Sequence, residues 1–207
     1  MPGGTSYYFS HGISHLNDWK NYKLVTSLAP SEYSSVDELT GKGLNVEIIP
    51  SKKTVYFENS YVIDGRMDAA EARKSVSKAD VVWLAGGDTP VQYAYLVKYG
   101  LDDAIRKHPG LIIGMSAGSI NLGKTAICTL TCRHNELEIY NALGCVDISV
   151  EPHFDHQNVT DELMQLSKEY TIYGLCDDSV IVCSDEKKEF YGEVYKLSNG
   201  IMEQLET

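Results

Sequence analysis

One stretch of the chain defines its architecture: Leu111-Ile112-Ile113-Gly114-Met115-Ser116-Ala117-Gly118-Ser119. An apolar run of strand length leads into Gly-x-Ser-x-Gly, and a stretch of helical character follows at 117–125. This succession of strand, sharp turn and helix is the setting in which a nucleophilic serine is presented at the end of a sheet. Small residues also let a strand and a helix approach closely, so a packing turn without chemistry is the alternative interpretation.

Further apolar runs lie on both sides of this stretch. Val81-Val82-Trp83-Leu84 is closed by Gly86-Gly87, and residues 172–175 form a third run. Continuous apolar runs are typical of strands buried on both faces. Helices are predicted between the runs at 68–78, 90–98, 117–125 and 160–168, the second with Thr89 as cap and Pro90 at its first position.

Alternation of strands and helices indicates a mostly parallel sheet covered on both faces. The C-terminal residues differ, because three short strands follow one another there with turn signals between them. We therefore expect one α/β domain over residues 1–207, a three-layer sandwich with a flavodoxin-like, mostly parallel central sheet and antiparallel C-terminal edge strands. The remaining strands are predicted at 6–11, 46–49, 54–57, 146–150, 179–183, 190–197 and 201–205.

Composition and charge exclude several classes of partner. The 207 residues carry a formal net charge of −11, which repels nucleic-acid phosphates and anionic membranes. Neither a secretory signal nor an apolar run of membrane-spanning length is visible, which predicts a cytoplasmic protein. Five cysteines without a repeated spacing indicate free thiols. The motif Cys128-x-x-x-Cys132-x-His134 is not a common zinc pattern, so we expect no metal and no cofactor.

A serine nucleophile needs a base and a group that orients the base. Among six histidines, His153 stands apart because it follows the predicted strand 146–150, at the sheet edge where catalytic groups gather. Two acids are candidates for the orienting group. Asp155 lies two residues past His153, and Asp177 follows the run 172–175. Spacing alone does not choose between them.

Four motifs in chain order resemble one known family. They are Gly86-Gly87-Asp88-Thr89, Gly114-Met115-Ser116-Ala117-Gly118, Glu151-Pro152-His153-Phe154 and Gly174-Leu175-Cys176-Asp177. Over about residues 60–185 the chain is similar to the S51 serine peptidases, which include aspartyl dipeptidases and cyanophycinases. Their fold is related to that of class I glutamine amidotransferases.

The resemblance implies a catalytic set of Ser116, His153 and Asp177, with the backbone N–H groups of Gly87 and Ala117 as the oxyanion hole. Three departures from the family pattern bear on specificity. Asp88 replaces a usual asparagine, residues 154–176 lack the arginine that binds an acidic substrate side chain, and Thr131 falls where the dipeptidase has an aspartate. A preference for N-terminal aspartate is therefore not implied. Candidate substrate-binding residues are His11, Asp88, Asp155 and His156.

These observations predict a serine hydrolase of dipeptidase or exopeptidase type that cleaves a peptide or amide bond through an acyl-enzyme. The expected partner is a small peptide or amide substrate, and surface tyrosines are compatible with a homodimer. The alternative function is that of a catalytically inactive amidotransferase-like domain that binds a small ligand or a partner. Asp88 and the absent arginine favour the alternative, whereas a complete set of serine, histidine and aspartate argues against it.

Overall fold

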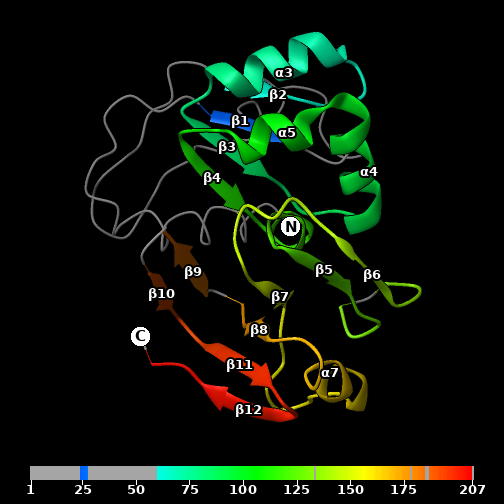
Figure 1. Cartoon of the computed structure of the whole chain (residues 1–207), viewed down its shortest axis with the longest axis vertical. Helices are drawn as coiled ribbons and strands as arrows, with labels where there is room; N and C mark the ends of the chain where they lie inside the picture. Colours follow the sequence, from blue (N-terminus) through cyan, green and yellow to red (C-terminus); the bar gives the residue numbers. More distant parts are fainter. Residues whose placement is uncertain (1–23, 28–59, 133, 178, 185–186, 207) are drawn as a thin grey trace, which may run out of the picture.

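A computed structural model describes residues 24–27, 60–132, 134–177, 179–184 and 187–206. The predicted strands at 6–11, 46–49 and 54–57 lie outside these ranges. Four parallel strands form the first sheet, in the order β2-β1-β3-β4 (Figure 1). The strands are β1 (Leu24–Ser27), β2 (Ser60–Val62), β3 (Val81–Leu84) and β4 (Leu111–Gly114).

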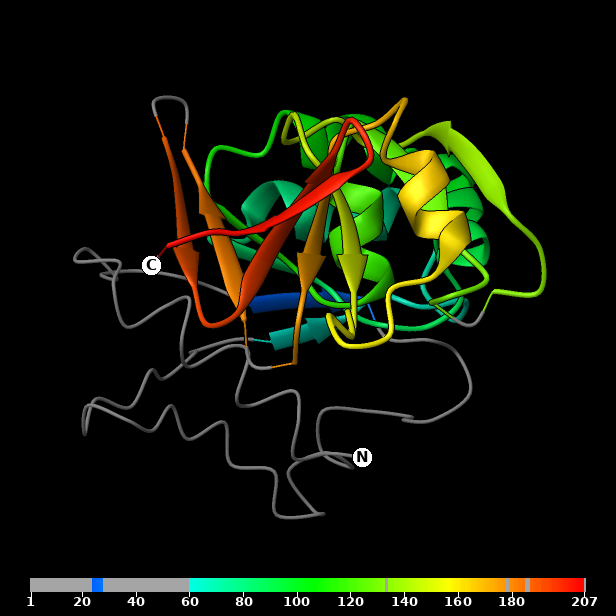
Figure 2. The same ribbon diagram turned by 90° about the horizontal axis from the view of Figure 1, so that it is seen from below.

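The second sheet has the order β12-β11-β8-β7. Its strands are β7 (Ser149–Pro152), β8 (Ile172–Leu175), β11 (Val194–Ser198) and β12 (Ile201–Gln204). β7 and β8 are parallel, whereas β11 and β12 are antiparallel additions that end at an edge, as predicted. Two hairpins complete the strands: β5 (Thr125–Cys128) with β6 (Glu138–Asn141), and β9 (Val180–Cys183) with β10 (Lys188–Tyr191), the second seen near β11 in Figure 2.

The helices begin where side chains can cap them. They are α3 (Ala69–Lys78), α4 (Thr89–Tyr99), α5 (Leu101–Arg106), α6 (Ala117–Leu122) and α7 (Asp161–Leu166). Asp68 accepts hydrogen bonds from two N–H groups at the start of α3, and Thr160 accepts one from Leu163 at the start of α7. At α4 the cap is Asp88, so the predicted cap Thr89 is wrong: Thr89 is the first helical residue.

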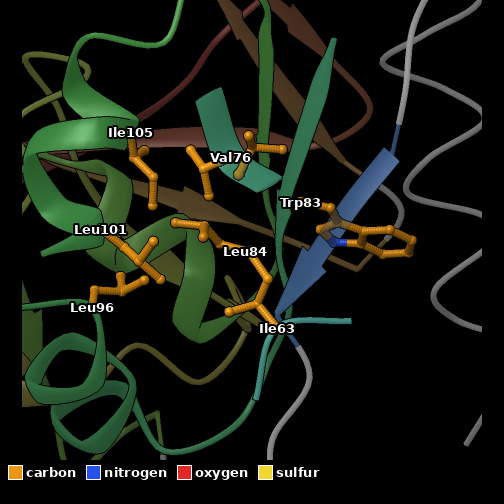
Figure 3. A pocket seen from close by; sticks show the side chains of 8 residues that line it. Ile63, Val76, Trp83, Leu84, Leu96, Leu101 and Ile105 are labelled. Carbon is orange, nitrogen blue, oxygen red and sulfur yellow. The ribbon is translucent and has the colours of Figure 1, made fainter. Parts of the chain in front are cut away.

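Two clusters of buried apolar side chains pack against the two four-stranded sheets, one on each sheet. Val76 of α3, Leu96 of α4 and Ile105 of α5 pack with Leu84 of β3. The pocket between them is lined by apolar side chains only, and Trp83 points to the opposite face of β3 (Figure 3). In the second cluster, Leu163 of α7 packs on the β8–β11 side of the other sheet. The short helix α6 contacts β4, β5 and β7, and so connects the two sheets.

Several element boundaries correct the prediction. The helix expected over 117–125 ends at Leu122, because Gly123 is extended and Thr125 pairs with Asn141. The strand expected over 146–150 lies at Ser149–Pro152, since the Val146 N–H is bonded to the Leu122 carbonyl instead. The strand expected over 190–197 is two strands, because Gly192 with φ 75° breaks it.

The α/β class is confirmed, with both parallel and antiparallel sheets. Within the described ranges the strands form two four-stranded sheets and two hairpins, and the three-layer arrangement around one central sheet stays a prediction. No helix in these ranges combines the length and the apolar character needed to cross a bilayer.

Candidate active site

Ser116 occupies a strained turn between β4 and α6. Its backbone has φ 51° and ψ −115°, a conformation that costs a residue with a side chain on the order of 1–3 kcal/mol. The glycines around it allow a close crossing of strand and helix. A Cβ added at Gly118 would lie 2.1 Å from the Leu84 carbonyl oxygen, and one at Gly114 would lie 2.6 Å from the Gly118 carbonyl oxygen. The turn therefore requires glycine on both sides of the serine.

The turn after β3 lies beside this serine. β3 and β4 are parallel with Leu84 opposite Gly114, so both strands end at the same edge of the sheet. A Cβ added at Gly86 would be 3.4 Å from the Ser116 Cβ and 3.8 Å from its Oγ. Gly87 has φ 142°, which few residues other than glycine adopt. Within the described part of the chain, no acceptor receives the backbone N–H of Gly87 or of Ala117.

His153 lies between Ser116 and Asp177. Its Nε2 is 3.1 Å from the Ser116 Oγ, and its Nδ1 is 2.9 Å from an Asp177 carboxylate oxygen. The pairing of β7 with β8 explains the second contact, since Pro152 is opposite Leu175 and both strands run the same way. The side chains of His153 and Asp177 are 53% and 72% exposed, so solvent and small molecules can reach them.

The backbone at His153 also departs from the strand that precedes it. The residue has φ 56°, in the left-handed region. The next residue, Phe154, donates its N–H to the Leu175 carbonyl, and its ring packs where Gly174 has no side chain: a Cβ there would be 2.5 Å from the ring. Phe154 thus anchors the turn that directs His153 toward Ser116.

Three other predicted site residues, Asp88, Asp155 and His156, have hydrogen-bond or ring partners of their own. Asp88 is exposed and accepts the Val91 N–H as the cap of α4. Asp155 accepts hydrogen bonds from Asn158 and Gln157, and the first of these is the main reason that the pKa of its carboxyl is lowered. His156 stacks on Tyr195, with ring centroids 5.0 Å apart. His11 lies outside the described residues.

The cysteines and the histidine of the rejected zinc motif do not converge. Cys128 is buried in β5, and its burial raises the pKa of its thiol to about 11. Cys132 donates to the Pro152 carbonyl at 3.5 Å, whereas the His134 Nε2 is 3.4 Å from the Thr89 hydroxyl. Among the described residues these three do not form a group of metal ligands.

One buried acid beside the site was not singled out from the sequence. Glu151 in β7 is only 1% exposed, and one of its carboxylate oxygens accepts the Thr129 hydroxyl at 2.7 Å. The other oxygen is buried without a hydrogen-bond partner among the described residues. Burial raises the pKa of Glu151 to about 7. The sequence signal was its place in the motif Glu151-Pro152-His153-Phe154, two residues before His153.

Comparison with known proteins agrees with this architecture. The family model described as peptidase family S51 matches residues 52–191. Among solved structures, a peptidase from an acI-B1 actinobacterium superposes with a TM-score of 0.64 at 19% identity, over 98% of this chain and 86% of the other. A candidate peptidase E protein from Listeria monocytogenes EGD-e superposes with a TM-score of 0.60 at 19% identity, over 84% and 88%. No curated protein matches the sequence.

A hydroxyl, an imidazole and a carboxylate in line, at the strand ends of an α/β fold, are an arrangement typical of hydrolases. The family match covers more than half of the chain. The chain belongs to peptidase family S51, and a peptidase function follows from that membership.

Proposed function

We propose that this peptidase is of the serine type, with Ser116 as nucleophile, His153 as general base and Asp177 as the group that orients the imidazole. One observation carries the proposal: the two ring nitrogens of His153 face different partners, the Ser116 Oγ at 3.1 Å and Asp177 at 2.9 Å. A base must accept the hydroxyl proton at one nitrogen while the other is held by an acceptor.

The chemistry proceeds in two steps. Ser116 Oγ attacks the carbonyl carbon of the scissile amide as its proton moves to His153 Nε2, and the carbonyl oxygen becomes negative. The backbone N–H groups of Gly87 and Ala117 are proposed to stabilise this oxyanion. His153 then gives the proton to the leaving amine, which yields an acyl-enzyme. A water molecule, deprotonated by His153, releases the acid product and restores the Ser116 hydroxyl.

The substrates that we propose are short peptides, cleaved in the manner of an exopeptidase or dipeptidase. The resemblance to dipeptidases and the exposed position of His153 and Asp177 support this. A preference for N-terminal aspartate is not part of the proposal, because residues 154–176 contain no arginine to pair with it.

The alternative, an inactive ligand-binding domain, loses one of its grounds. The carboxylate of Asp88 could oppose an oxyanion, but it is bonded to the first turn of α4. Such a bond holds the charge at the helix N-terminus, where it is favourable.

A fluorophosphonate probe separates the two functions, because it labels only an activated serine. We expect labelling of the native chain and none of Ser116→Ala. Ser77→Ala serves as the matched control, since its hydroxyl lies at the exposed end of α3 and is bonded to the Lys74 carbonyl. Absence of labelling in the folded native chain, or unchanged labelling in Ser116→Ala, would contradict the serine mechanism.

A further inference from the structure

A second cluster of polar side chains lies beside the candidate active site. His156 follows β7, Cys176 follows β8 and Glu193 precedes β11. The backbone holds two of them together, because the Cys176 N–H donates to the Glu193 carbonyl at 3.2 Å. The third residue, His156, is held in place by its imidazole ring, which stacks on the Tyr195 ring at an interplanar angle of 13°.

The donor atoms of this cluster converge on one point. His156 Nδ1 is 3.9 Å from the Cys176 Sγ and 3.9 Å from a Glu193 carboxylate oxygen, and all three atoms lie within 4.8 Å of one another. The separation of His156 Nδ1 from the Glu193 oxygen is longer than a normal hydrogen bond between nitrogen and oxygen, which is roughly 2.7–3.2 Å. The separations within the cluster approach those of about 3.3–3.6 Å between ligands that bind one tetrahedral zinc ion at about 2.0–2.3 Å.

The imidazole of His156 contacts its partners in a different way from that of a catalytic base. A base between a nucleophile and an acid needs both ring nitrogens, as in His153. His156 directs the same nitrogen, Nδ1, at both the sulfur and the carboxylate. Burial, together with the charge of Glu193, raises the pKa of the Cys176 thiol, which is the opposite of what a reactive cysteine needs.

We propose that His156, Cys176 and Glu193 form a binding site for a thiophilic divalent cation of the zinc type. Sulfur, imidazole nitrogen and carboxylate oxygen together match the preferences of zinc, and three protein ligands leave a fourth position for water. The Glu193 side chain is 57% exposed and free to close the remaining distance. The cation displaces the thiol proton when it binds, so one proton is released for each sulfur–metal bond formed.

This site is separate from the proposed peptidase chemistry, in which no metal takes part. It does adjoin that chemistry, because Cys176 directly precedes Asp177 and His156 is three residues beyond His153. A bound cation would therefore tie together the loops that carry His153 and Asp177. The sequence did not predict this site, since its three members lie at positions 156, 176 and 193 without a regular spacing.

Cobalt(II) is a suitable probe, because a cobalt–thiolate bond gives a charge-transfer band in the near ultraviolet. We expect the purified full chain to bind one Co²⁺ with such a band, and Zn²⁺ to displace it. Cys176→Ser should lose the band. Cys183→Ser is the matched control, since this half-buried thiol lies on the neighbouring strand β9, and it should keep the band.

Two further variants keep the test decisive if Cys176→Ser does not fold. Glu193→Gln changes an exposed side chain and His156→Ala a partly exposed one. Each should weaken Co²⁺ binding by at least the roughly 10–100-fold that loss of an outer-shell partner costs. A native chain without a thiolate band, a band that persists in Cys176→Ser, or unchanged affinity in both other variants would overturn the proposal. Because the readout is spectroscopic, it is independent of whether the serine mechanism is correct.

Discussion

His153 and His156 lie three residues apart in the same loop and differ in what their ring nitrogens face. His153 has an oxygen partner on each side of its ring, whereas His156 presents one nitrogen to two partners. The first arrangement suits proton transfer, and the second suits a shared cation. The chemistry of each histidine thus follows from its orientation, which the left-handed backbone at His153 sets for the first and stacking on Tyr195 for the second.

The acid partner of His153 can be tested directly. Asp177→Asn should lower kcat on the order of 10²- to 10⁴-fold with a smaller effect on KM, because an amide can hold the imidazole in the wrong tautomer. Asp155→Asn should cost less, since Asp155 is bonded to its own loop. Steady-state kinetics of both variants on one peptide checks this. A larger loss in Asp155→Asn would reverse the assignment.

The buried acid Glu151 makes a prediction about pH and stability. Its pKa is about 7 in the folded chain against an ordinary 4.5, so folding favours the protonated form. The associated stabilisation is complete below the unfolded pKa and is lost as pH rises through about 7, a change of about 3 kcal/mol at most.

Glu151→Gln removes this titration while keeping an acceptor for the Thr129 hydroxyl. Relative to the native chain, the variant should therefore be more stable at about pH 8 than at about pH 5. Urea unfolding of both proteins at the two pH values measures the difference. If the free energies of unfolding of variant and native chain differ by the same amount at both pH values, Glu151 does not titrate in this range.

Sequence reasoning reached some of these residues and not others. The Gly-x-Ser-x-Gly pattern and the strand before His153 made both residues candidates, and their side chains lie 3.1 Å apart in the structure. Spacing left Asp155 and Asp177 open, and the family resemblance pointed to Asp177. The parallel pairing of β7 with β8 explains why Asp177 lies beside His153. Glu151 was missed because its burial depends on the packing of the hairpin β5–β6, which was itself not predicted.

At the scale of elements, the crossing of α6 over β3 and β4 fixes the position of Ser116, the proposed nucleophile. Gly118 makes this crossing possible, because its Cα lies against the Leu84 carbonyl. The six-residue helix ends as soon as the chain must turn into β5. The strain at Ser116 is held by this packing on both sides.

The crossing can be tested by adding one methyl group. Gly118→Ala should destabilise the fold by about 3 kcal/mol, even though alanine is the better helix former, because the new Cβ would lie 2.1 Å from a backbone oxygen. Gly144→Ala is the matched control. Its Cβ meets nothing within 4 Å, and only the positive φ of 65° remains, at a cost of about 1–2 kcal/mol.

Urea unfolding of the two variants gives the comparison. Equal destabilisation would mean that the close approach of α6 to β3 is not a constraint on the fold.

The strands with continuous apolar runs, such as β3, β4 and β8, were predicted from the sequence. The strands β1 and β2, the hairpin β5–β6 and the short helix α5 were missed. Part of the hairpin's outer surface is exposed, so its pattern is mixed. Only Gly100 separates α4 from α5, so the sequence shows no loop between the two helices. The helix predicted at 90–98 therefore corresponds to α4 alone.

At the scale of the whole molecule, the candidate site lies where the two sheets meet. Ser116 comes from the end of the first sheet, whereas His153 and Asp177 come from the second. The helix α6 packs against both β4 and β7 and so brings the ends of these strands close together. No local pattern in the sequence predicts that Ser116, His153 and Asp177 lie close together. That expectation came from the resemblance of four motifs, in chain order, to one family.

Peptide hydrolysis by the native chain and by Ser116→Ala tests the proposed enzyme most directly. In a screen of a dipeptide library we expect the native chain to cleave at least one member, and Ser116→Ala to cleave it with a kcat/KM lower by roughly 10³-fold or more. Circular dichroism of both proteins verifies that the fold is retained. Equal hydrolysis by the two proteins would contradict the role of Ser116 as the nucleophile.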